Sequence, residues 1–89
     1  MDKRVGFVGI IIEKRAQSAE PVNKILSTFG ECVIVRTGVR DIRGHSVIML
    51  VVDATTDQIG ALTGKLGMLP GVSVKSAISK EMSAPGTAV

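Results

Sequence analysis

The chain has 89 residues, which is enough for one small domain and too few for two. It is 45% hydrophobic, yet Phe7 and Phe29 are its only aromatic residues, so it lacks the aromatic platforms on which single-stranded nucleic acids usually stack. Eleven Lys and Arg residues against eight Asp and Glu residues give a net charge of +3, an ordinary surface for a small domain. We therefore expect no direct DNA binding by this domain.

The N-terminal apolar run superficially mimics a signal peptide because a basic segment precedes it. The run covers residues 5–12 and stops at the charged residues 13–15, and no small-residue cleavage site follows. It is also far shorter than the ~20 residues that a membrane-spanning helix needs. We expect a buried strand, no membrane association and a cytoplasmic location.

The first half of the chain predicts a strand followed by an amphipathic helix. Residues 4–13 are β-branched and apolar, as in a strand. For the helix, Ser18 is the expected N-cap, Pro21 fits only in the first turn, and Gly30 supplies the stop. One apolar stripe follows from three- and four-residue spacing: Ala19, Val22, Ile25, Leu26 and Phe29.

Two further strands are predicted at residues 31–38 and 44–53, joined by a short polar hairpin loop at 39–43. A second helix opens at Thr55, where Gln58 three residues later completes a capping box. Its expected buried stripe is Ile59, Leu62, Leu66 and Leu69.

The last strand is predicted at residues 72–79, after the turn at Pro70. Residues 1–80 thus form one domain, and residues 81–89 are expected to be a flexible C-terminal tail.

The order strand–helix–strand–strand–helix–strand is the split βαβ pattern. Right-handed crossovers place both helices on the same face of the sheet. We predict an α+β, ferredoxin-like βαββαβ fold with a four-stranded antiparallel sheet, the first and third strands central and the other two at the edges.

Both central strands are apolar on both of their faces, although two helices can cover only one face of the sheet. Strands of this kind are normally buried on both sides. We therefore predict a homodimer or homotetramer in which a second copy covers the other face. Alternation alone does not show which of the two sets of alternate side chains (the two phases of the strand) points to the helices. The interface candidates are Val8, Ile10, Ile12, Ile48, Leu50 and Val52.

No catalytic or metal centre is predicted. His45 and Cys32 are the only histidine and the only cysteine, and they fall on different predicted strands. Two ligands are too few for a metal, and a lone thiol is commonly buried as a small hydrophobe. The loop at residues 13–18 lacks the glycine-rich phosphate loop of ferredoxin-like acylphosphatases. We expect no enzyme activity, no bound metal and no cofactor.

Two surface features have both a functional and a plain structural interpretation. Arg36, Arg40 and Arg43 are candidates for contact with an anion or a partner protein, since guanidinium groups suit carboxylates and phosphates; a solvated turn is the alternative. Three glycines in the second helix suggest close backbone approach to the sheet, a neighbouring subunit or a ligand, with packing the simplest reason. They are Gly60, Gly64 and Gly67.

Residues 3–80 resemble the iron-only hydrogenase system regulator family. The segments KRVGFVGIIIE, SAEPVNKIL and VRTGVRDIRGHSVIMLVVDA carry the resemblance, and LTGKLGMLPGVSVK is its most specific part. The resemblance implies an ACT-like version of the ferredoxin-like fold, similar to the C-terminal sensing domain of nickel-responsive regulators. It also implies oligomerisation and a regulatory role.

Ligands of the related domains do not carry over to this chain. Amino-acid-binding ACT domains usually have a glycine in the loop after the first strand, and residues 13–18 contain none. Nickel sensors present several histidines, whereas this chain has only His45. The ribbon–helix–helix that binds DNA in the nickel-responsive regulators is also missing.

Two functional hypotheses remain at this point. The first is a non-enzymatic, oligomeric regulatory domain that senses a small-molecule effector or binds a partner protein. The second is a stand-alone DNA-binding transcription factor, which the arginine-bearing hairpin favours.

Overall fold

Four strands and two helices follow one another in the computed structural model, which describes residues 3–80. The predicted tail at residues 81–89 lies outside the described residues. The elements are β1 (Lys3–Ile12), α1 (Arg15–Thr28), a 3₁₀ turn η1 (Gly30–Cys32), β2 (Val33–Ile42), β3 (His45–Thr55), α2 (Thr56–Gly67) and β4 (Val72–Ile78).

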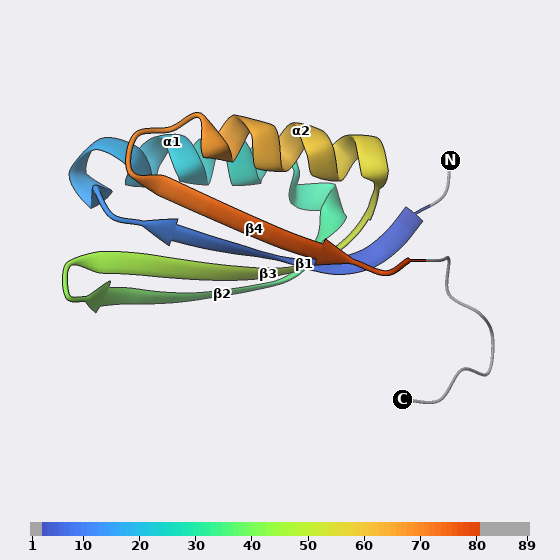
Figure 1. Cartoon of the computed structure of the whole chain (residues 1–89), viewed down its shortest axis with the longest axis horizontal. Helices are drawn as coiled ribbons and strands as arrows, with labels where there is room; N and C mark the ends of the chain where they lie inside the picture. Colours follow the sequence, from blue (N-terminus) through green and yellow to red (C-terminus); the bar gives the residue numbers. More distant parts are fainter. Residues whose placement is uncertain (1–2, 81–89) are drawn as a thin grey trace.

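The sheet has the strand order β2-β3-β1-β4, and every neighbouring pair is antiparallel. Both helices lie on the same side of it, and within residues 3–80 the other side carries no second layer (Figure 1). The predicted βαββαβ fold with central β1 and β3 is therefore confirmed.

The six residues predicted as interface candidates lie instead in the core beneath the helices, and that prediction is wrong. Val8 and Ile10 on β1 pair across the sheet with Leu50 and Ile48 on β3, and all four are buried. The remaining two candidates, Ile12 and Val52, are buried in the same cluster. Because β1 and β3 are apolar in both phases, their alternation could not show which phase the helices cover. The helices contribute to this core Val22, Leu26, Ile59, Leu62 and Leu66.

The two helices begin in different ways. At α2 the predicted capping box is present: Thr55 Oγ1 accepts from the Gln58 backbone N–H, and Gln58 Oε1 accepts from the Thr55 N–H. At α1 the predicted cap is wrong, because the helix begins at Arg15 and Ser18 lies inside it. Pro21 is therefore an interior residue of α1 and not a first-turn residue, which removes a helical backbone donor at that position.

The hairpin between β2 and β3 is tighter than predicted. β2 runs on to Ile42, which pairs with His45, so only Arg43 and Gly44 form the turn. Their φ angles of 54° and 81° are both positive, as a type I′ turn requires. Between Val39 and Ile42, β2 has one residue more than the paired segment of β3, which is a β-bulge. Most of the residues predicted as a loop therefore belong to the bulged end of β2.

The glycines of α2 face open space. A Cβ built on Gly60, Gly64 or Gly67 would meet no heavy atom within 4 Å. Close approach of these glycines to the sheet is therefore wrong for the described part of this chain, whereas approach to a neighbouring subunit or to a ligand stays a prediction. Their exposed side of α2 is opposite to the buried stripe of Ile59, Leu62 and Leu66.

Candidate functional site

The side of the sheet turned away from the helices is an apolar surface, which we call the open face. Strand pairing aligns its side chains in three rows that each cross all four strands. Because side chains alternate along a strand, these rows carry the phase opposite to the buried core. The rows are Val35–Val51–Phe7–Ala77, Thr37–Met49–Gly9–Lys75 and Val39–Val47–Ile11–Ser73.

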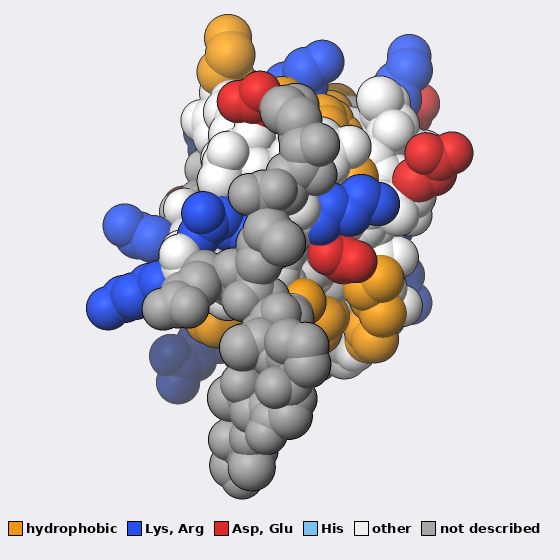
Figure 2. All heavy atoms as spheres, turned by 90° about the vertical axis from the view of Figure 1, so that its right-hand side faces the viewer, with side chains coloured by type: hydrophobic (Ala, Val, Ile, Leu, Met, Phe, Trp, Pro, Cys, Tyr) orange, Lys and Arg blue, Asp and Glu red, His pale blue; other side chains and the backbone are white. Residues whose placement is uncertain are grey.

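Lys75 is the one charged residue among these twelve positions. At the two margins of the same face, Val5 pairs with Asp53 and Ile42 pairs with His45. The large side chains of the open face are well exposed: Phe7 keeps 50% of its surface accessible and Met49 keeps 43%. Hydrophobic side chains are visible at the surface in the lower part of Figure 2, which is the sheet side of the molecule. A continuous patch of large exposed apolar side chains is typical of protein interaction sites.

A shallow hollow of about 190 Å³ lies within the open face. Gly9 forms part of its wall because it has no side chain, and Ile11, Val47, Met49 and Lys75 surround it. The open face thus presents both protruding side chains and a recess between them.

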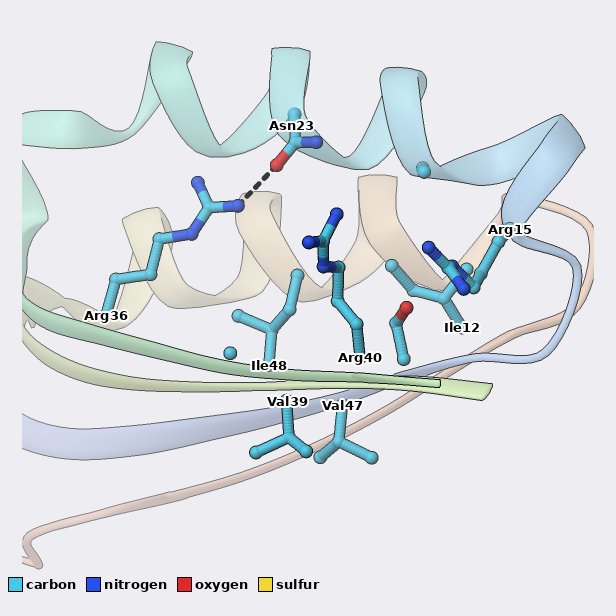
Figure 3. Close-up of a pocket in the computed structure, with 11 residues that line it drawn as sticks. Ile12, Arg15, Asn23, Arg36, Val39, Arg40, Val47 and Ile48 are labelled. Carbon is cyan, nitrogen blue, oxygen red and sulfur yellow. Dashed lines mark hydrogen bonds between the residues drawn. The ribbon is translucent and has the colours of Figure 1, made fainter. Parts of the chain in front are cut away.

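A second hollow, of about 300 Å³, lies on the helix side of the sheet between α1 and the edge strand β2. Arg36 and Arg40 from β2 and Arg15 from α1 point into it, while Val39 points to the opposite side of the sheet (Figure 3). Two of the three predicted anion-contact residues therefore meet here. The third, Arg43, lies in the turn outside the lining of this hollow.

Arg15 is the member of this group that sequence reasoning missed. It lies one and two helical turns before Ala19 and Asn23, which line the same wall. The four-residue spacing was visible in the sequence, but it could not show that this side of α1 faces β2.

The arginines of the second hollow differ in their partners. Arg36 donates a hydrogen bond from Nη2 to Asn23 Oδ1, which links β2 to α1 (Figure 3). Arg15 forms a 3.8 Å ion pair with Asp41, whose side chain is 78% exposed. Within residues 3–80, no carboxylate oxygen lies within 4.0 Å of the Arg36 or Arg40 guanidinium.

Cys32 and His45 do not form a common site. Cys32 is buried at the end of the sheet where Val33 pairs with Val52, whereas His45 lies at the other end of β3. His45 Nε2 is 3.8 Å from Glu13 Oε1, at the opposite end of the molecule from the thiol. Among the described residues, no group of three or more His, Cys, Asp or Glu side chains is arranged to hold a metal ion.

The family is decided by a match over most of the chain. The family model described as "TM1266-like: Iron-only hydrogenase system regulator, putative" matches residues 4–76. The chain belongs to this family. The TM1266-like match covers β2, β3 and both helices in full and all but the outermost residues of β1 and β4, so both hollows and nearly all of the open face lie within it.

Solved structures of similar fold agree with this assignment. The uncharacterized protein TM1266 from Thermotoga maritima is 37% identical, with a TM-score of 0.83 over 89% of this chain and 100% of that chain. The C-terminal domain of the MgtC protein from Mycobacterium tuberculosis is 13% identical, with a TM-score of 0.68 over 92% of this chain and 94% of that chain, and shows the fold alone. No match was found among curated proteins. Neither helix in residues 3–80 has the length and apolar character that crossing a membrane requires.

Proposed function

We propose that this TM1266-like protein is a non-enzymatic regulatory domain that works as a homo-oligomer, with its open face packed against the open face of a second copy. Membership of the regulator family supports the regulatory role. The observation that carries the oligomer is the exposed apolar surface of Phe7, Ile11 and Met49 on the uncovered side of the sheet.

The size of the open face matches a stable interface. Eight large hydrophobic residues on this side of the sheet are at least 40% exposed, and each leaves roughly 80 Å² open, about half the area of a large side chain. Two copies would together remove roughly 1,300 Å² from water, which lies within the range of specific protein interfaces. The eight residues are Val5, Phe7, Ile11, Val35, Val39, Ile42, Met49 and Val51.

The shape of the open face suits a second copy of the same chain better than an unrelated charged partner. Phe7 protrudes one row away from the hollow at Gly9, so the same surface carries both a projection and a recess. A two-fold axis brings the projection of each copy to the recess of the other, as in an isologous interface. Two sheets that face one another in this way form a core about 10 Å thick.

The absence of enzyme activity is part of the same proposal. The described residues offer one thiol and one imidazole, Cys32 and His45, at opposite ends of the sheet, so they do not form a nucleophile–base pair. A regulatory domain needs only a surface for its own copy and a place for an effector or a partner protein.

Light scattering coupled to gel filtration tests the proposal. We expect wild type to be a dimer or a tetramer at micromolar concentration. We expect Phe7→Glu to be a folded monomer, because association would bury the new carboxylate between the two sheets and remove its hydration. The matched control is Met68→Glu, since Met68 is 85% exposed and lies beyond the end of α2 rather than on the open face. Met68→Glu should keep the mass of the wild type.

A wild-type monomer at 100 μM protein, or a Phe7→Glu variant that keeps the oligomeric mass, would overturn the proposal. Retention of the protein on DNA that weakens steeply as salt is added would instead support the stand-alone DNA-binding factor.

A further inference from the structure

The hollow between α1 and β2 lies on the helix side of the sheet at the margin of the hydrophobic core, whose residues Ile12 and Ile48 form part of its wall. Its walls come from one side of α1, where Arg15, Ala19 and Asn23 are spaced by four residues, and from alternate residues of β2. On β2, Gly38 stands between Arg36 and Arg40, and a Cβ built there would meet only the Val47 carbonyl oxygen, at 3.9 Å. The missing side chain leaves the space into which the neighbouring arginines turn.

The charges around this hollow are unbalanced within the described residues. Three guanidinium groups converge on it, and the one carboxylate paired with them is Asp41, which is mostly exposed and contacts only Arg15. Arg36 is held by the neutral Asn23 amide. Because like charges that share a cavity repel one another, an anion between them would be attracted by all three.

The lining favours a compact ligand with several anionic oxygens. Each guanidinium presents parallel N–H donors that match a carboxylate or phosphate group. Ser46, a buried residue on β3, adds a hydroxyl to the lining, and Ile12 and Ile48 form an apolar part of the wall at the base of the exposed Arg36 and Arg40 side chains. A volume of about 300 Å³ is at the lower end for small-molecule sites, which suits a small anion.

We propose that the hollow formed by Arg15, Arg36 and Arg40 binds a small, multiply charged anion whose clustered oxygens belong to phosphate or carboxylate groups. Anion binding by these residues does not depend on the proposed regulatory function. The role of the anion as an effector does rest on that function. Strand β2 connects the hollow to the open face. Its residues Arg36 and Arg40 line the hollow, while Val35 and Val39 lie on the open face.

Isothermal titration calorimetry of the full chain with pyrophosphate and with citrate, at matched ionic strength, tests the site. Comparing the two ligands shows whether the site binds phosphate or carboxylate groups. We expect saturable binding of at least one of the two, with one anion per chain. Arg36→Gln and Arg40→Gln should each weaken it about tenfold or more, since each removes charge-assisted hydrogen bonds. Arg40→Lys keeps the charge but loses the paired donors, so its loss should be smaller.

Arg43→Gln is the matched control, because Arg43 is in the same hairpin but outside the hollow; its affinity should stay within about twofold of wild type. No saturable binding of either anion, or an equal loss in Arg43→Gln, would overturn the site. Light scattering on the same samples keeps the two proposals apart: an oligomer that binds neither anion contradicts only this site, and a monomer that binds one contradicts only the oligomeric function.

Discussion

The Ser18 hydroxyl donates a 2.6 Å hydrogen bond to the Pro70 carbonyl oxygen, which joins the first turns of α1 to the loop between α2 and β4. Ser18 is completely buried, so its hydroxyl needs a partner within the protein. The Ser18 hydroxyl is therefore bonded to a distant loop and does not cap α1, which begins at Arg15.

We expect Ser18→Ala to lower the free energy of unfolding by about 1 kcal/mol, the usual net contribution of such a bond. Urea denaturation measures this change. Ser27→Ala is the control, because the Ser27 hydroxyl bonds to Asn23 O within its own helix and is exposed. Equal losses in the two variants would show that the contact with Pro70 adds no stability.

The neighbouring residues Ile10 and Ile11 lie on opposite faces of β1 and should respond differently to truncation. Ile10 is fully buried, so Ile10→Ala should lower the free energy of unfolding by about 2–5 kcal/mol at any protein concentration. Ile11 is on the open face, so the loss in Ile11→Ala should grow as protein concentration rises and copies associate. Thermal unfolding at several concentrations distinguishes the two; a concentration-independent loss in Ile11→Ala would contradict the proposed interface.

Gly64 lies inside α2 with open space around it, so an alanine side chain would fit there without a clash. Alanine would also reduce the backbone entropy that the unfolded chain loses when it folds. Gly64→Ala should therefore raise the free energy of unfolding by about 0.5–1 kcal/mol, as chemical denaturation would show. Gly44→Ala should have the opposite effect, because Gly44 has a φ of 81° in the hairpin turn. If Gly64→Ala instead breaks up the oligomer, then this side of α2 contacts another copy.

Local sequence signals were sufficient where the interaction partners lie close together along the chain. Thr55 and Gln58 form the capping box predicted from their spacing, and Ile59, Leu62 and Leu66 are buried as their period indicated. Leu69, the fourth residue of the predicted stripe, lies beyond the end of α2 and is only partly buried. The same signals misplaced the start of α1. Ser18 has the chemistry of an N-cap, but its partner Pro70 is 52 residues away and had no local signature.

The candidate arginine site was anticipated only in part for the same reason. Arg36 and Arg40 share one phase of β2, whereas Arg43 follows a bulge that ends this alternation. Arg15 joins them only because α1 crosses the sheet beside β2 (Figure 3).

The amino-acid sequence by itself determined the order of strands and helices, the central position of β1 and β3, and the excess of apolar surface on those strands, because each depends on spacing along the chain or on general rules of chain connection. Only the tertiary structure decided that Val8, Ile10 and Leu50 face the helices while Phe7, Ile11 and Met49 face outward. Both phases of these strands are hydrophobic, so burying either one stabilises the sheet to a similar extent. The packing of α1 and α2 against one phase selects between them.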